Sequence, residues 1–91
     1  MGFTLFHTDM LPGVPEKLVF EPDGATVGEV LQWLADRYGV AALHDVLDHD
    51  GILHEEAMVV LNGGILHRED ALAVVVPAGS ELMITVKIAG G

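Results

Sequence analysis

The 91-residue sequence contains no cysteine. This absence excludes disulfides, thiol nucleophiles and thiolate metal ligands, and with them any persulfide carried on a side chain. A chain of this length buries only about 60–65% of the surface that its unfolded form exposes, so its core is modest and has no covalent staple. A domain without disulfides suits a reducing compartment, and we expect a cytoplasmic protein.

Basic residues are also scarce. Four Lys and Arg face fourteen Asp and Glu, which gives a formal net charge of −10 at pH 7. Such a surface repels polyanions, so we expect neither nucleic acid nor an anionic membrane as a partner. The acidic charge either steers the domain to a basic patch on a protein partner or serves only to keep the chain in solution.

Long apolar segments are missing as well. One of the longest runs, residues 71–77, falls far short of the roughly 20 residues that a membrane-spanning helix needs. The first residues carry no basic segment ahead of an apolar one, so we expect no secretory signal. Hydrophobic residues nevertheless make up 51% of the chain, which is enough for one compact domain over residues 1–91.

The first half of the chain predicts a hairpin followed by a helix. Residues 3–8 and 17–21 favour strands, and a connection rich in proline and glycine separates them. Thr26 and Glu29 match the capping box that begins a helix. Apolar residues spaced three and four apart continue to Tyr38, and Gly39 fits the end of the helix.

The second half predicts mainly strands. A short helical turn is possible within residues 40–47, and residues 57–61 favour a strand that ends at an Asn-Gly turn. A shorter strand is expected near residues 65–67 or 73–76, and the last strand is expected over 81–88. One helix cannot cover both faces of a sheet, so we predict an α+β fold in which a mixed sheet of four to five strands packs on one main helix, as in the β-grasp.

One loop is rich in residue types that bind zinc or manganese. They are His44, Asp45, Asp48, His49, Asp50, His54, Glu55 and Glu56. Their spacing matches no closed metal site, so we interpret the segment as a solvated acidic loop and expect no metal.

Three features of the sequence support a family resemblance. They are Leu61-Asn62-Gly63 after the predicted third strand, Pro77-Ala78-Gly79-Ser80-Glu81 before the last strand, and a chain that ends in Ala89-Gly90-Gly91. Together with the element order, they resemble the MoaD/ThiS-like sulfur carrier family, which includes the small subunit of molybdopterin synthase and the thiamine-pathway sulfur carrier. The resemblance implies a ubiquitin-like β-grasp with an exposed tail over residues 89–91.

The resemblance also implies a function that depends on the tail. A partner enzyme of the E1-like adenylyltransferase type would use ATP to activate the carboxylate of Gly91. A sulfur donor of the desulfurase or rhodanese type would convert the product to a thiocarboxylate, which then supplies sulfur to a synthase subunit. The chain itself would be a carrier rather than an enzyme and would bind no cofactor.

The site residues follow from this role. Gly91 carries the reacting group and Gly90 precedes it, while we expect partner contacts from Ala89, Ile88, Lys87, Thr85 and Met83. An α-carboxyl group has a pKa of about 3.3–3.7, so the terminal carboxylate is ionised at neutral pH. Glycines lack Cβ atoms and can thread a narrow channel. Because the chain has no cysteine, this carboxylate is the only obvious covalent site for sulfur.

Several alternatives stay open at this point. The chain could be a noncovalent binding module in which the tail has no role. It could instead be a ubiquitin-like modifier, which would join Gly91 to lysines of other proteins. The pathway is also open among molybdopterin, thiamine, cysteine, thiolated tRNA and tungsten-cofactor routes, with the molybdopterin type favoured. Molybdopterin-type carriers commonly have an aromatic residue and proline before the tail, but Ile84 to Ile88 here include Lys87 and no proline.

Overall fold

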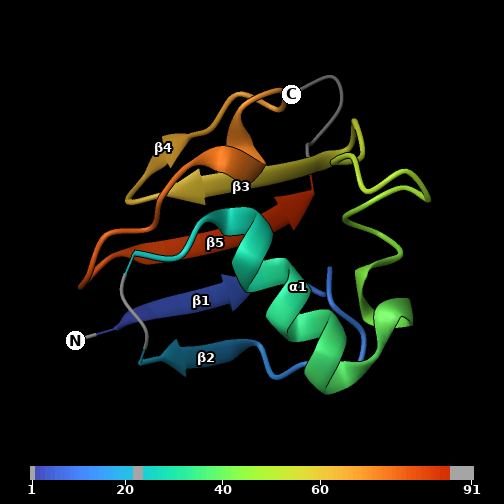
Figure 1. The fold of residues 1–91 in the computed structure, drawn as a ribbon, viewed down its shortest axis with the longest axis horizontal. Coiled ribbons are helices and arrows are strands. Elements are labelled where there is room, and N and C mark those ends of the chain that lie inside the picture. The colour runs from blue at the N-terminus through green and yellow to red at the C-terminus, as the bar shows by residue number, and fades with distance from the viewer. Residues whose placement is uncertain (1, 22–23, 87–91) are drawn as a thin grey trace.

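The computed structural model describes residues 2–21 and 24–86. Within these ranges five strands form one sheet, and one α-helix crosses one of its faces (Figure 1). The helical and extended elements are β1 (Phe3–His7), β2 (Lys17–Phe20), α1 (Val27–Tyr38), the 3-10 turn η1 (Val40–Leu43), β3 (Ala57–Leu61), β4 (Gly64–Ile65), the 3-10 turn η2 (Ala71–Ala73) and β5 (Glu81–Val86).

The strand order across the sheet is β2-β1-β5-β3-β4. The central pair, β1 and β5, is parallel, and the other neighbours are antiparallel. The predicted α+β fold with a mixed sheet and one main helix is therefore confirmed. This arrangement is possible because the helix and the β3–β4 hairpin separate β1 from β5 in sequence, as a parallel pair requires.

The helix begins and ends where the sequence predicts. Thr26 Oγ1 accepts the Glu29 backbone N–H at 3.1 Å, and Glu29 Oε1 accepts the Thr26 N–H at 3.0 Å. At the other end, Gly39 has a φ of 98° and donates its N–H to Ala35 O. Local chemistry thus fixes both ends of α1, and the core-facing side chains follow the predicted spacing: Val27, Val30, Leu31, Leu34 and Ala35.

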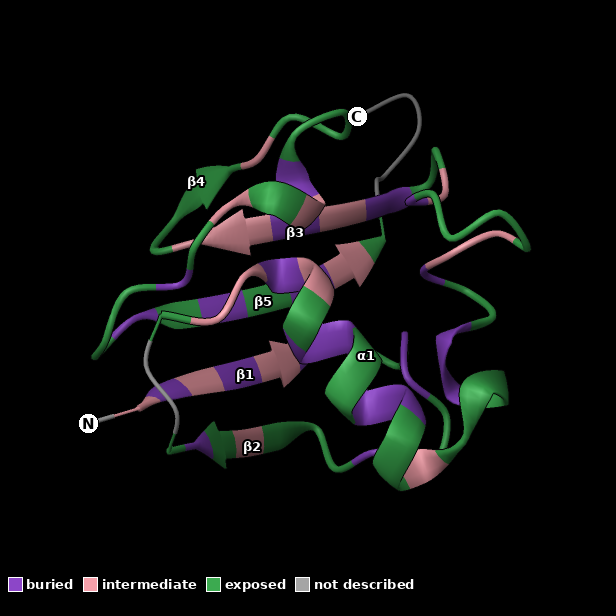
Figure 2. Cartoon of the chain, in the orientation of Figure 1, coloured by how far each residue is buried: buried purple, intermediate pink, exposed green. Residues whose placement is uncertain are grey.

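The core lies between α1 and one face of the sheet. Leu5 of β1 pairs with Leu82 of β5, which in turn pairs with Leu61 of β3. Leu5 and Leu82 are fully buried, and Figure 2 shows buried residues alternating with more exposed ones along these strands. Since side chains alternate between the two faces of a strand, every second residue of β1, β3 and β5 faces away from the helix.

Some predicted boundaries need correction. The short strand is β4 (Gly64–Ile65), slightly earlier than residues 65–67, because Asn62 (φ 50°) and Gly63 (φ 85°) form a tight turn and pairing begins at once. The alternative segment, 73–76, contains only one isolated bridge, between Val75 and Thr26. β5 is described to Val86, and the rest of the predicted last strand lies outside the described residues.

In the ranges that the structure describes, no helix has the length and apolar character needed to cross a membrane.

Candidate functional site

The strand that leads to the C-terminal tail is the central strand of the sheet. β5 lies between β1 and β3, and its last described residue, Val86, pairs with Ala57. Lys87, Ile88, Ala89, Gly90 and Gly91 lie outside the described residues. The tail therefore follows an element that is hydrogen-bonded on both sides.

Met83 and Thr85 lie on the face of the sheet opposite α1, as the alternation along the last strand predicts. Met83 pairs with Phe6 of β1 on one side and with Val60 of β3 on the other. Its side chain is 39% exposed, which is a large fraction for an apolar residue in a central strand. The role of these residues in partner binding stays a prediction.

A hollow of about 800 Å³ lies over this part of the sheet. Phe6, Val60 and Met83 supply its apolar surface, while Lys17 and Glu81 add charge at its border. The Lys17 Nζ lies 5.8 Å from the centroid of the Phe6 ring. An apolar floor with a charged border is the usual composition of a protein-binding surface.

Sequence reasoning did not select Phe6 or Val60 for this surface. Their alternation with core residues could have indicated this face, because Phe6 follows the buried Leu5 and Val60 follows the buried Val59. What the alternation does not give is the register that places them beside Met83.

Two threonines fasten the end of β5 to the chain after β1. Thr8 and Thr85 share a hydrogen bond of 2.8 Å between their Oγ1 atoms, and the Thr8 N–H donates to Ile84 O at 3.2 Å. Thr85 is the penultimate described residue of β5. This contact fixes the strand just before the chain continues into the tail.

His7 holds the loop that follows β1. The ring is buried, and its Nε2 lies 2.9 Å from Val14 O and 3.0 Å from Pro15 O. Two carbonyl partners require the proton on Nε2, which leaves Nδ1 to accept the Leu11 N–H at 3.3 Å. No sequence pattern indicates this role, since a single histidine at the end of a strand is not distinctive.

The two loop motifs of the sequence meet in space. The Asn62 side chain accepts the Glu81 N–H at 2.9 Å and donates to Ser80 Oγ at 3.2 Å. Ser80 is buried, so this bond satisfies a polar group that would otherwise be costly. The turn after β3 thus fixes the point at which β5 begins.

The acidic loop lies near Val86, at the end of β5 that leads to the tail. A cavity of about 630 Å³ is lined by Val86, Met10 and Arg68 together with several of the loop's carboxylates and imidazoles: His44, Asp45, Asp48, His54, Glu55 and Glu56. In residues 2–21 and 24–86, no group of three or more His, Asp or Glu side chains converges to hold a metal ion. A solvated acidic loop remains our interpretation of this segment.

Asp48 organises the tip of this loop. Its Oδ1 accepts the N–H of Asp50 at 2.8 Å and of Ile52 at 3.0 Å. The hydrogen bond from Ile52 is the main reason that the pKa of Asp48 is lowered. The carboxylate is therefore used within the loop as a turn-forming acceptor.

A single helix held on one face of a mixed five-stranded sheet, with the last strand at its centre, defines a ubiquitin-like β-grasp protein. The model of the ThiS family matches residues 7–91, and the chain belongs to that family. The predicted resemblance to MoaD/ThiS-like sulfur carriers is thereby confirmed.

Solved structures of the same fold cover nearly the whole chain. SAMP1 from Haloferax volcanii is 26% identical with a TM-score of 0.71, and each chain is covered completely. The HVO 2177 protein of the same organism is also 26% identical, with a TM-score of 0.73 over 100% of this chain and 87% of its own. Urm1 from Trypanosoma brucei is 19% identical with a TM-score of 0.71 over 99% and 95%, a likeness of fold alone. No curated protein is a significant match.

Proposed function

We propose that the chain is a sulfur carrier whose working group is the carboxylate of Gly91. The observation that carries this proposal is membership of the ThiS family over residues 7–91, a range that includes the terminal Gly-Gly pair. The position of β5 supports it, because a tail that follows a central strand starts from a rigid base.

The chemistry proceeds in three steps. An E1-like adenylyltransferase binds ATP, and the carboxylate of Gly91 attacks the α-phosphorus, so that pyrophosphate leaves and an acyl-adenylate forms. The terminal sulfur of a persulfide on a desulfurase or rhodanese-type donor then attacks the carbonyl carbon and displaces AMP. A thiol reduces the resulting acyl disulfide and frees the thiocarboxylate. ATP belongs to the partner, and the carrier holds no cofactor of its own.

The open face of the sheet is the proposed docking surface for the activating enzyme. Phe6, Val60 and Met83 supply the apolar contact, and Thr85 lies beside them toward the tail. Ile88, Lys87 and Ala89 would then enter the partner's channel ahead of Gly90. A net charge of −10 favours a partner with basic residues around its binding surface.

The sulfur acceptor that we propose is a synthase subunit, with the molybdopterin type favoured. A second candidate function is that of a protein modifier, which would join Gly91 to lysines on other proteins. It is supported by the 26% identity to SAMP1 and the 25% identity to the small archaeal modifier protein 1 of Haloferax volcanii. Both functions share the adenylation step and differ in the acceptor.

Exchange of labelled pyrophosphate into ATP by an E1-like enzyme tests the shared step. We expect exchange to depend on the carrier and to disappear when Gly91 is converted to its C-terminal amide by semisynthesis. The amide is a matched control because it keeps every residue and removes only the carboxylate. Exchange that persists with the amide would contradict the proposal. Conjugates of higher mass in a cell lysate would favour the modifier.

A further inference from the structure

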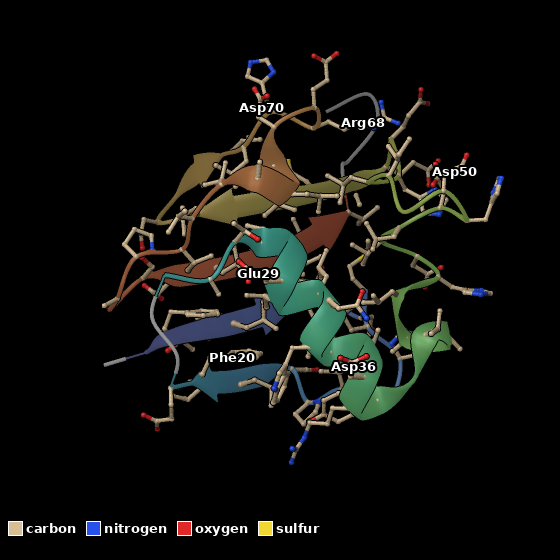
Figure 3. The ribbon with its side chains drawn as sticks, viewed as in Figure 1. Phe20, Glu29, Asp36, Asp50, Arg68 and Asp70 are labelled. Atoms are coloured by element: carbon tan, nitrogen blue, oxygen red, sulfur yellow. The ribbon has the colours of Figure 1, made fainter. Side chains whose placement is uncertain are left out.

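Three aromatic side chains form a series that runs from the core to the surface. Phe3 of β1 stacks on Phe20 of β2 with centroids 4.9 Å apart, and Phe20 meets Trp33 of α1 edge-on at 4.8 Å. The two phenylalanines are buried, whereas Trp33, the only tryptophan, is 43% exposed. In Figure 3, Phe20 is labelled on β2 and Asp36 near the end of the helix. The series thus ends at the surface between α1 and the outer strand.

Arg37 extends this series. Its guanidinium carbon lies 5.4 Å from the Trp33 ring centroid and 5.9 Å from that of Tyr38, the only tyrosine. No carboxylate of a described residue forms an ion pair with Arg37, and the Asp36 side chain accepts a hydrogen bond from Gln32 at 3.1 Å. A guanidinium held over aromatic rings still has N–H donors available for a carboxylate.

In the described part of the chain, β2, whose Phe20 contacts Trp33, has a row of backbone groups without hydrogen-bond partners. The N–H groups of Thr4 and Thr8 donate toward β5, and that of His7 donates toward the chain entering β2. Odd-numbered residues of β1 therefore bond to β2, and the antiparallel register assigns their partners as Leu18 and Phe20. The backbone groups of Lys17 and Val19 point outward from the edge of the sheet.

This edge is open in the described part of the chain. β2 is the first strand in the sheet order, and no other backbone hydrogen bond there involves Lys17 or Val19. Val19 is 67% exposed, and Figure 2 shows β2 as mostly exposed. Lys17 and Val19 are two residues apart, and each presents one N–H donor and one C=O acceptor at this edge. This spacing matches the hydrogen-bonding pattern of a strand added to a sheet.

We propose that β2 and the Trp33–Arg37 surface form a second docking site, which takes an extended segment of a partner protein as a sixth strand. The segment pairs with Lys17 and Val19, packs an apolar side chain against Trp33 and places a carboxylate on Arg37. Charge favours an acidic segment at this place, because Lys17 and Arg37 are two of only four basic residues in the chain. A second copy of this chain fits poorly, since two domains of charge −10 repel each other.

This site goes beyond the proposed sulfur-carrier role, and of the residues named for it only Lys17 also lines the hollow around Met83. The docking surface for the activating enzyme lies on the open face around Met83, whereas Trp33 belongs to the helix on the opposite face. Binding at β2 is therefore independent of the tail. A chain without Gly90 and Gly91 should bind a β2 ligand as tightly as the full chain does, so the two proposals can fail separately.

A displayed library of random twelve-residue peptides, selected on the full chain and counter-selected on Arg37→Glu, identifies ligands without assuming a sequence. We expect enriched peptides with alternating apolar residues and at least one Asp or Glu. Their binding should perturb the amides of Lys17 and Val19 in NMR spectra and slow the exchange of those amides with solvent. Arg37→Gln should weaken binding about tenfold, as the loss of a charge-assisted hydrogen bond does.

A pair of variants tests the backbone pairing directly. Val19→Pro removes an N–H that points outward, so the β1–β2 ladder is kept and the added strand loses a donor. Val19→Thr keeps the N–H and serves as the matched control, and thermal unfolding checks that both variants fold. The proposal is overturned if no peptide depends on Arg37, if Val19→Pro folds and binds like Val19→Thr, or if the selected peptides perturb only Phe6, Val60 and Met83.

Discussion

Two single residues, His7 and Asn62, hold backbone segments in place through side-chain hydrogen bonds that local sequence does not indicate. His7 is buried beneath the loop after β1, where it contacts backbone groups of Leu11, Val14 and Pro15. Asn62 reaches from one turn to the residue that begins β5. His7 thus fixes the loop that leads to β2, and Asn62 fixes the start of the strand that leads to the tail.

Replacement of His7 tests this idea. His7→Phe fills the space but leaves two carbonyls without a donor and the Leu11 N–H without an acceptor, so we expect a loss of about 2–4 kcal/mol of unfolding free energy. Urea unfolding monitored by circular dichroism measures the loss. His49→Phe is the control, because that side chain is 91% exposed and its replacement should change stability by less than about 0.5 kcal/mol. Equal stability of the two variants would show that the His7 bonds do not matter.

The residues of the open face were predictable only in part. Met83 and Thr85 could be selected because their strand is long and alternates regularly. Phe6 and Val60 belong to the same surface, but their place depends on the pairing of strands distant in sequence. Periodicity gives the face of a residue within its own strand, and register between strands decides which residues become neighbours.

At the scale of elements, local signals were the reliable ones. The capping box at Thr26 and the glycine at position 39 predicted both ends of α1, because each signal acts within one turn of helix. β4 is only two residues long and has no periodicity of its own, so its bounds follow from the turn at Asn62 and Gly63. The ends of α1 were predicted more accurately than the bounds of β4, because the contacts that cap α1 are close in sequence and the helix has a periodicity that β4 lacks.

The acidic loop gives a prediction that depends on pH. The hydrogen bond from the Ile52 N–H lowers the pKa of Asp48, so the folded loop favours the ionised carboxylate. The stabilisation is complete above the unfolded pKa, near about pH 4, and is lost as the pH falls through the lowered value. We expect the exchange protection of the Ile52 and Asp50 amides to decrease in that acidic range.

Amide exchange measured between pH 6 and 2, after correction for intrinsic rates, follows this change. Asp48→Asn provides the matched variant, because its side-chain oxygen still accepts the two N–H groups and does not titrate. Its protection should be independent of pH over the same range. A wild-type profile as flat as that of Asp48→Asn would exclude a role for the Asp48 charge.

At the scale of the whole molecule, the sheet separates two surfaces. One face carries α1 and the core, and the other carries the hollow around Met83 beside the strand that leads to the tail. The parallel pairing of β1 with β5 puts the tail strand at the centre, a feature that element order alone does not give. The family resemblance predicted the β-grasp, which the strand order confirms, and the central place of the last strand is a finding of the structure.

Charge placed in the hollow should block docking without unfolding the domain. Met83→Glu adds a carboxylate to the apolar floor, and we expect the KM of the activating enzyme for the carrier to rise at least about tenfold. Ile52→Glu is the control, since Ile52 is also exposed but lies in the acidic loop. An unchanged KM for Met83→Glu in the pyrophosphate exchange assay would place the docking surface elsewhere.

In the function that we propose, sulfur is carried on the carboxylate of Gly91, and the absence of cysteine makes this directly measurable. The protein is incubated with ATP, its activating enzyme and a sulfur donor, then treated with a thiol-alkylating reagent and analysed as peptides by mass spectrometry. Peptide mapping is needed because the exchange of oxygen for sulfur nearly matches the mass of one methionine oxidation, and the chain has four methionines. We expect a single adduct at Gly91. An activated tail that gains no adduct there would contradict it.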